Sequence, residues 1–335
     1  MNEPLLKITD KILHARKTSS KEIKQLYLCD DLPLFDLLWA ANKIRGKFKT
    51  NKVELCSIVN AKSGNCSEDC KFCAQSIHHN TKIERYPLLD EQSILKAAKS
   101  ARANSATCFG MVTSGKRIQK PKEISGICKA VKMIRTKIPS MKCSVSLGAI
   151  DKRSLSRLKE AGIKKIHHNL ETSENYFPNV CTTHTYEERL KTLRAAKKLG
   201  IRLCSGGIFG LGESRTDRLD LAFTLRELDV DSVPLNFLHP VKGTALENSV
   251  PMAVSEILRT IAIFRLILPK KDIKVCGGRA VNLRSMQSMI FFAGANGMMI
   301  GNYLTQAGQD SKTDLKMIKD LGLRVTGGDD NAEIY

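Results

Sequence analysis

The feature that most constrains the fold is a repeated alternation of short apolar runs with amphipathic stretches, from about residue 53 to about residue 300. Apolar runs separated by segments of helical periodicity indicate βα units, which form a parallel sheet. The chain therefore belongs to the α/β class. We expect strands over residues 53–59, 105–113, 142–147, 164–169, 202–209, 231–236, 273–276 and 297–300.

Eight βα units predict a TIM-type (β/α)8 barrel, whose active site lies at the carboxyl ends of the strands. Residues 1–50 read as amphipathic helices and predict an N-terminal helical cap on this barrel. The barrel itself is expected over residues 51–322. The polar residues 323–335 predict a poorly ordered C-terminal tail.

Composition restricts the compartment and the partners. No apolar run approaches the roughly 18 residues that span a membrane, and the N-terminus lacks an apolar signal core. Eleven cysteines in such a chain indicate metal or redox chemistry in a reducing compartment, so we expect a cytoplasmic protein. The net charge of +20 could serve nucleic acid, but the lysines are scattered and no aromatic-interleaved basic motif occurs, which favours a solvated surface.

The strongest local signal is a CxxxCxxC motif formed by Cys66, Cys70 and Cys73 in the loop after the first expected strand. Three thiolates can bind three irons of a [4Fe–4S] cluster, which leaves the fourth iron open to a substrate. A structural zinc site is the alternative. It needs four ligands, and His78 or His79 could supply the fourth. The spacing favours iron–sulfur over zinc.

This motif, with Phe72 before its last cysteine, resembles the signature of the radical SAM superfamily. The resemblance implies that S-adenosylmethionine (SAM) binds the open iron through its amino and carboxylate groups. It also implies that an electron from the cluster cleaves SAM to a 5′-deoxyadenosyl radical, which abstracts hydrogen from an unactivated carbon. Phe72 is then expected near the adenine.

The chain from about residue 45 to about residue 320 further resembles the biotin synthase family. That resemblance implies a radical SAM sulfurtransferase that converts dethiobiotin to biotin, with two SAM cleavages and a second, auxiliary iron–sulfur cluster as the sulfur donor. It also implies an electron donor such as flavodoxin or ferredoxin, and a homodimer. The matching segments are residues 60–76, 168–173, 185–190, 203–213, 231–236, 242–244 and 277–279.

Four further cysteines fall within expected strands, where side chains can point into the barrel lumen below the CxxxCxxC motif. By resemblance, the auxiliary cluster is [2Fe–2S] and has an arginine as its fourth ligand, which matches Arg279. The family's usual strand-2 cysteine would fall on Gly110, two residues after Cys108. Side chains two residues apart in a strand point to the same side, so the Cys108 thiol could still enter the lumen. The four cysteines are Cys108, Cys143, Cys204 and Cys276.

Cys276 stands where relatives more often carry serine, so it offers an additional thiolate. We therefore hypothesise a four-iron auxiliary cluster bound by these four cysteines, with Arg279 as a neighbour rather than a ligand. The remaining cysteines, Cys29, Cys56, Cys128 and Cys181, are expected to serve packing or the surface.

Four polar residues match positions for SAM and substrate. By resemblance, Asn169 contacts the SAM ribose and the ureido oxygen of dethiobiotin, and Glu171 accepts from the ribose hydroxyls. Arg189 is expected to pair with the SAM carboxylate, and Asn236 to bind the ureido group. Judged without the family, the preferred interpretations are a helix-surface ion pair of Arg189 with Glu188 or its neighbours, and a strand-end cap at Asn236.

Two other functions stay open on the sequence alone. The first is a radical SAM enzyme of the biotin synthase type that acts on another substrate, although such an enzyme without sulfur transfer would not need cysteines inside the barrel. The second is a metal-containing nucleic-acid-binding protein, suggested by the net charge of +20.

Overall fold

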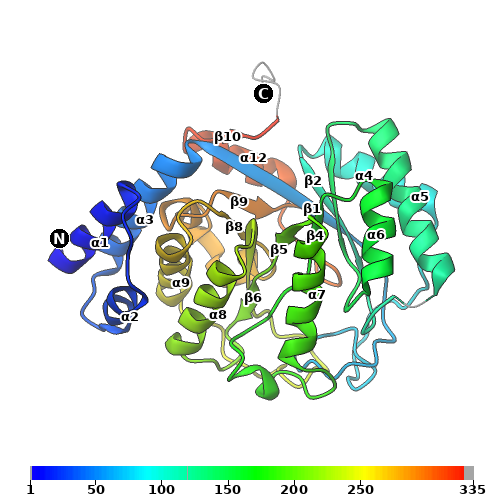
Figure 1. Cartoon of the computed structure of the whole chain (residues 1–335), viewed down its shortest axis with the longest axis horizontal. Coiled ribbons are helices and arrows are strands. Elements are labelled where there is room, and N and C mark those ends of the chain that lie inside the picture. The colour runs from blue at the N-terminus through cyan, green and yellow to red at the C-terminus, as the bar shows by residue number, and fades with distance from the viewer. Residues whose placement is uncertain (1, 119, 328–335) are drawn as a thin grey trace.

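The computed structural model describes residues 2–118 and 120–327. Its centre is a closed barrel of parallel strands (Figure 1). The ring closes where β9 pairs with β1, with Gly297 beside Glu54. One position of the ring is shared by two short strands, β5 and β6, which both pair with β7. The strands are β1 (Lys52–Lys62), β2 (Cys108–Thr113), β3 (Lys142–Ser146), β4 (Lys165–His167), β5 (Arg202–Cys204), β6 (Gly207–Phe209), β7 (Ser232–Phe237), β8 (Asp272–Val275) and β9 (Gly297–Met299).

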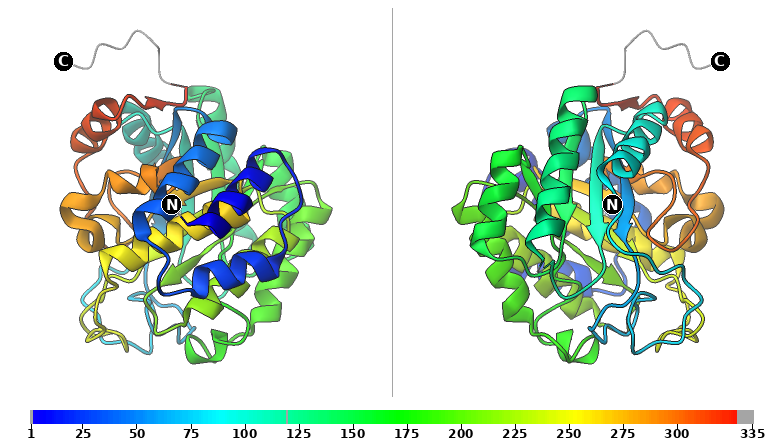
Figure 2. Two further views of the ribbon diagram at one scale, coloured as in Figure 1. Left: turned by 90° about the vertical axis from the view of Figure 1, so that its left-hand side faces the viewer. Right: turned by 90° about the vertical axis from the view of Figure 1, so that its right-hand side faces the viewer.

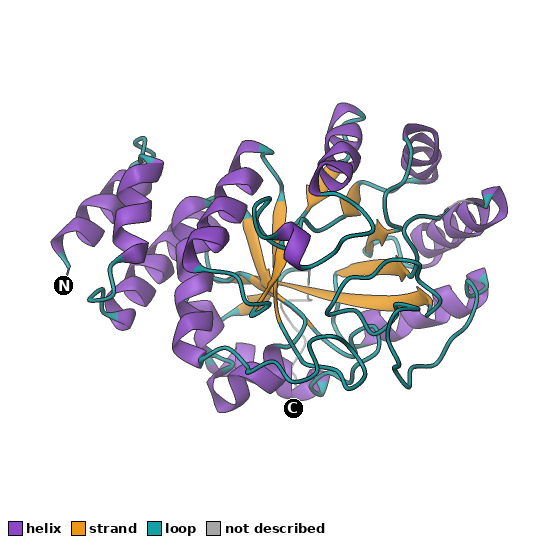
Figure 3. Cartoon of the chain, turned by 90° about the horizontal axis from the view of Figure 1, so that it is seen from below, coloured by secondary structure: helices purple, strands orange, loops and turns teal. Residues whose placement is uncertain are grey.

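Helices surround this barrel, as Figure 3 shows from below, and the expected (β/α)8 architecture is confirmed. Several begin at side-chain caps that satisfy free backbone N–H groups: Asp90, Asp151 and Ser214 each accept from the third residue of their helix. The helices are α4 (Glu91–Ala103), α5 (Pro121–Lys137), α6 (Lys152–Ala161), α7 (Tyr186–Lys198), α8 (Arg215–Glu227), α9 (Val254–Ile267), α10 (Arg279–Leu283), α11 (Met289–Phe292) and α12 (Ser311–Asp320).

Three helices, α1 (Glu3–Leu13), α2 (Ser20–Leu28) and α3 (Leu34–Lys49), precede the barrel and pack on one side of it (Figure 2). Their apolar faces join the barrel's own core, in which Leu5, Tyr27 and Leu37 are fully buried. Tyr27 lies beside α9, where its hydroxyl is 3.5 Å from that of Thr260. Burial of this apolar stripe attaches the N-terminal helical extension to the barrel wall.

The C-terminal segment differs from expectation. Arg324–Val325 form a short strand, β10, which pairs in parallel with Lys52 and Val53 at the start of β1. Leu323 and Val325 pack against the core, which gives this segment an apolar anchor. Residues 328–335 of the expected tail lie outside the described residues. Within the described part of the chain, no helix is both long and apolar enough to cross a membrane.

Candidate active site

The cysteine triad lies where the sequence predicted, in the loop after β1 at the carboxyl end of the barrel. The backbone turns sharply here, with positive φ angles at Gly64 and Asn65. Backbone bonds then fold the loop on itself, because Cys66 N–H donates to Gln75 and Cys73 N–H donates to Cys70. The light-blue loop at the lower end of Figure 2 is this segment. All three thiols are therefore presented at the mouth of the barrel.

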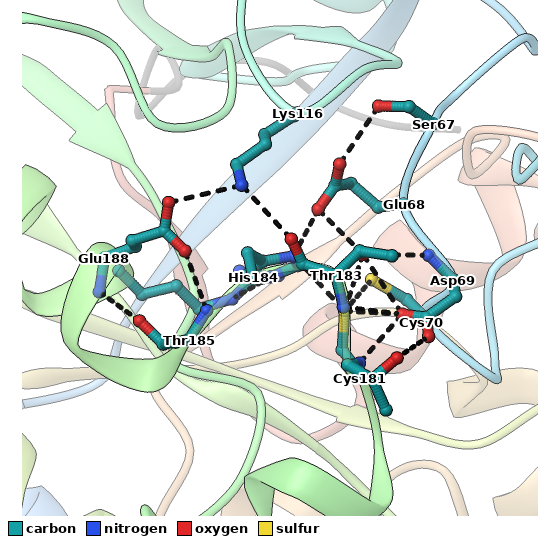
Figure 4. Close-up of polar contacts among 12 residues, drawn as sticks. Ser67, Glu68, Asp69, Cys70, Lys116, Cys181, Thr183, His184, Thr185 and Glu188 are labelled. Atoms are coloured by element: carbon teal, nitrogen blue, oxygen red, sulfur yellow. Dashed lines mark hydrogen bonds and ion pairs between the residues drawn. The ribbon is translucent and has the colours of Figure 1, made fainter.

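A dense polar network fixes Cys70 (Figure 4). The Cys181 Sγ lies 3.6 Å from the Cys70 Sγ. The carboxylate of Asp69 accepts from the backbone N–H of Thr182 at 2.9 Å and from the Cys181 thiol at 3.0 Å. His184 Nδ1 lies 2.6 Å from the Glu68 carboxylate. The segment around Cys181 and His184 thus anchors the triad loop to the opposite wall of the site.

The sequence assigns Cys181 to packing or the surface, whereas the structure places it beside the triad. In the described residues, the ligand atoms of Cys70, Cys181 and His184 lie within 4.8 Å of one another. The two histidines considered as zinc ligands behave differently. His78 and His79 contact the backbone carbonyls of Ser67 and Cys73, at 3.1 Å and 2.8 Å respectively. The one sequence signal for Cys181 is its place just before residues 185–190, which match the family.

A cavity of about 180 Å³ opens beside the triad and is lined by all four residues that the resemblance assigns to SAM. Arg189 on α7 is nearly buried, donates to the Asn169 carbonyl at 2.9 Å, and lies 3.5 Å from the Glu171 carboxylate. It does not form the surface ion pair with Glu188 that the sequence left open. Instead, Glu188 caps its own helix. The structure therefore brings Phe72, Asn169, Glu171 and Arg189 together with all three cysteines.

Glu171 is held in an unusual backbone conformation, with φ of 71°. Such a left-handed angle costs roughly 1–2 kcal/mol for a residue with a Cβ and is common at functional sites. Two bonds to the neighbouring strand maintain it: Glu171 N–H donates to Gly206, and Ile208 N–H donates to the Glu171 carbonyl. A Cβ on Gly207 would lie 2.2 Å from that carbonyl oxygen, so glycine is required there. The carboxylate is thereby aimed into the cavity.

A second cavity, of about 350 Å³, occupies the barrel lumen and shares Phe72, Cys73, Asn169 and Glu171 with the first. The two cavities thus adjoin each other. Asn236 lines the lumen, where its amide donates to the Gly207 carbonyl at 3.0 Å and accepts from Gly277 N–H at 2.8 Å. One amide hydrogen and one lone pair remain for a ligand. Asn236 therefore tethers the backbone at the strand ends and can still bind substrate.

Three of the four cysteines predicted for the lumen, Cys108, Cys204 and Cys276, line this cavity. Cys143 does not, and the prediction that it faces the lumen is wrong. Cys143 pairs in register with Phe109, and both side chains pack into the core outside the strands. Ser144, one residue later, pairs with Gly110 and lines the lumen. Since successive side chains of a strand point to opposite faces, a shift of one residue reverses the facing.

The structure instead places Cys56 in the lumen, although it was expected to serve packing. Cys56 on β1 pairs directly with Cys108 on β2. The ammonium of Lys274 lies 3.0 Å from the Cys56 Sγ. Alternation along β1 carried the signal, because Cys56 is two residues from Ile58, which also faces the cavity.

Arg279, expected as a ligand or neighbour of the auxiliary cluster, begins α10 and does not line the lumen cavity. Its guanidinium donates to the Asp314 carboxylate at 2.7 Å, and both side chains are almost fully buried. The cationic side chains that do line the lumen near the thiols are Lys165 and Lys274. The ligand role of Arg279 is therefore not supported by its position.

The charges around Cys204 favour a thiolate at neutral pH. Burial alone would raise the pKa of Cys204, but His167, with its Nδ1 3.4 Å away, and the two lumen lysines lower it to about 7. Thiolates are the ligands that iron–sulfur clusters require. The soft sulfur donors that the lumen offers, beside Lys165 and Lys274, fit such a cluster.

The barrel, the triad at its mouth and the adjoining cavity define a radical SAM enzyme, and residues 61–225 match the Radical SAM superfamily. Residues 234–324 match the Biotin and Thiamin Synthesis associated domain. The chain is 51% identical to the biotin synthase of Geotalea uraniireducens over 96% of this chain and 98% of that one. It is also 51% identical to the biotin synthase of Geobacter metallireducens over 98% and 99%. The chain belongs to the biotin synthase family.

Solved structures agree on the fold. Methylornithine synthase superposes with a TM-score of 0.80 at 19% identity, over 95% of this chain and 97% of that one. The [FeFe]-hydrogenase maturase HydG superposes with a TM-score of 0.81 at 15% identity, over 96% of this chain and 76% of that one. At these identities the likeness concerns the architecture alone.

Proposed function

We propose that this enzyme inserts sulfur into dethiobiotin to form biotin, with SAM as the radical source and an auxiliary cluster as the sulfur donor. The observation that carries the proposal is the pair of adjoining cavities, one beside the triad and one that holds Asn236 and a group of thiols within the barrel, with Asn169 lining both. A substrate carbon held between a radical source and a sulfur source is the arrangement that sulfur insertion needs.

The chain's own residues position SAM. Cys66, Cys70 and Cys73 would hold a [4Fe–4S] cluster, which would supply the electron that cleaves SAM. Arg189 offers a planar, bidentate donor for the SAM carboxylate, and its contacts with Asn169 and Glu171 keep it in place. The Glu171 carboxylate can accept from both ribose hydroxyls.

The substrate is oriented by two amides on the same side of the lumen, which bond to the adjacent residues Gly206 and Gly207. Asn169 follows β4 and Asn236 lies on β7, and both line the lumen cavity. A neutral urea group has donors and acceptors that match an amide. With the ureido ring held by these amides, the carbons to be functionalised can point toward the thiols deeper in the barrel.

The auxiliary cluster is proposed to be a four-iron type rather than the family's two-iron type. Its support is the number of thiols in the lumen, which allows one thiolate for each iron without an arginine ligand.

The enzyme is proposed to act in the cytoplasm, because its eleven cysteines are free and free thiols are typical of a reducing compartment. An electron donor such as flavodoxin or ferredoxin and a homodimeric assembly complete the proposal, and nucleic acid is not expected as a partner.

An anaerobic single-turnover assay tests the function. Reconstituted enzyme is mixed with SAM, dethiobiotin and reductant, and the products are quantified by mass. We expect biotin together with about two deoxyadenosines for each biotin, one for each C–H bond broken. Deoxyadenosine without biotin would support the radical SAM chemistry but would indicate that the substrate is a molecule other than dethiobiotin. If the fully loaded enzyme formed neither biotin nor deoxyadenosine, that result would contradict the assignment of the triad.

Replacement of Asn236 by serine is expected to weaken dethiobiotin binding about tenfold or more. Loss of one substrate hydrogen bond inside a cavity, with its partner left unpaired, costs about 1–3 kcal/mol. SAM affinity serves as the internal control, because Asn236 lines the lumen cavity but not the cavity beside the triad. Equal losses of SAM and dethiobiotin affinity would indicate a general disturbance of the strand ends instead.

A further inference from the structure

The lumen thiols define the ligand set of the auxiliary cluster more sharply than the sequence did. We infer that this cluster is bound by four thiolates, those of Cys56, Cys108, Cys204 and Cys276, with Lys165 and Lys274 as its cationic neighbours. The inference rests on the proposed function and deepens it, because it assigns the residues that hold the sulfur donor.

The first argument is convergence. Cys56 and Cys108 lie side by side on β1 and β2, and Cys204 ends β5. Cys276 directly follows β8. All four are buried, all are free, and all line the same cavity of about 350 Å³. Four strands around the barrel thus contribute one thiol each, as a compact cluster bound by single cysteines from separate strands requires.

The second argument is exclusion of the other candidates. Cys143 packs with Phe109 in the core outside the strands, so its thiol could enter the lumen only if β3 shifted by one residue. Such a shift would also move Ser144 and the whole strand out of register. Arg279 is engaged by Asp314 in a buried ion pair. Neither residue lines the lumen cavity.

The third argument is charge. Lys274 is only 2% exposed and Lys165 only 7%, and buried ammonium groups need anionic partners. Glu54 accepts from Lys274 and lies 3.4 Å from the Lys142 ammonium, so it neutralises only one of these charges. A cluster core of charge about +2 with four thiolates has a net charge of about −2. It therefore supplies the anionic partner that Glu54 alone does not provide for the two buried lysines.

Lys274 also has a defined place in this arrangement. Its ammonium bridges the Cys56 thiol, at 3.0 Å, and the Glu54 carboxylate. A cation at this point favours the deprotonated form of the thiol, and the four thiols must lose their protons when they bind iron. Lys274 therefore acts as a positioning residue at the floor of the site rather than as a ligand.

The experiment uses a background in which Cys66, Cys70 and Cys73 are alanine, so that the auxiliary cluster is the iron–sulfur cluster that remains. Into this chain we introduce Cys56→Ala, Cys276→Ala or, as the matched control, Cys143→Ala. Each variant is reconstituted anaerobically. Iron, acid-labile sulfide and the visible and Mössbauer spectra are then measured beside far-UV circular dichroism.

Cys56→Ala and Cys276→Ala are each expected to lose most of the remaining iron and sulfide, at least about fivefold, while Cys143→Ala keeps both. Full iron and unchanged spectra in Cys56→Ala, or loss of iron in Cys143→Ala with an intact fold, would overturn the ligand set. Failure of the proposed function is distinguishable, because it would appear as no biotin from the fully loaded wild-type chain whatever these iron counts are.

Discussion

A chain with Cys66, Cys70 and Cys73 replaced by alanine is expected to form no 5′-deoxyadenosine above background, a loss of at least about a thousandfold. The physical reason is that the cofactor supplies the bond-breaking chemistry, while the protein supplies binding and orientation. The three thiols lie in a loop at the mouth of the barrel, outside the strands, so the fold should survive their removal. Anaerobic turnover with SAM and reductant, analysed by mass spectrometry, measures the effect.

The same chain also counts the irons of the auxiliary cluster. About four irons per chain at full loading are expected from the four-iron type, and about two would contradict it in favour of the family's two-iron type. Cys29→Ala provides a matched control, since this cysteine is exposed on the N-terminal helical extension. It should keep wild-type iron content and deoxyadenosine formation. A comparable loss in this control would point to thiol oxidation rather than to loss of ligands.

The barrel was readable from the sequence because the signal is repeated. Eight apolar runs separated by amphipathic stretches overdetermine a (β/α)8 fold, and an error of one or two residues at a strand end does not alter it. The triad was equally readable, since its three ligands lie within a single loop. Local spacing alone determines that they can meet.

The residues that line the lumen were harder to predict, because the exact register of a strand decides which of its side chains point inward. Cys143 and Ser144 differ by one position, and only the pairing of β3 with β2 decides which of them enters the cavity. Strand pairing likewise places Cys56 in the lumen, because Cys56 on β1 pairs with Cys108 on β2. Sequence patterns place cysteines within a strand reliably, but they do not fix the strand's rotation about its axis to within one residue.

Contacts between distant segments were beyond the sequence for a different reason. Cys181 lies 3.6 Å from Cys70, although 111 positions separate them along the chain. Arg279 similarly finds Asp314 on α12, 35 positions away. Such pairs follow from the packing of loops and helices around the finished barrel. The family match suggested that Arg279 is a metal ligand. In the structure, Arg279 instead forms a buried ion pair with Asp314.

Replacement of Asp314 by alanine is expected to lower the free energy of unfolding by about 3–5 kcal/mol. The ion pair with Arg279 is almost fully buried, at 1% and 0% side-chain exposure, so the variant leaves an arginine without its counter-charge. Burial raises the pKa of Asp314 even against the attraction of Arg279. The pair as a whole therefore adds little net stability, and the cost lies in breaking it.

Two further variants separate this explanation from a ligand role for Arg279. Asp320→Ala, on the same helix, removes an exposed pair with Lys316 and should change stability by no more than about 0.5 kcal/mol. The double variant Arg279→Met with Asp314→Leu removes both buried charges and should recover most of the lost stability. Urea unfolding of variants with equal cluster loading measures all three. If Arg279 bound the cluster, the double variant would instead lose auxiliary iron, and stability restored with full iron content would place Arg279 in the scaffold.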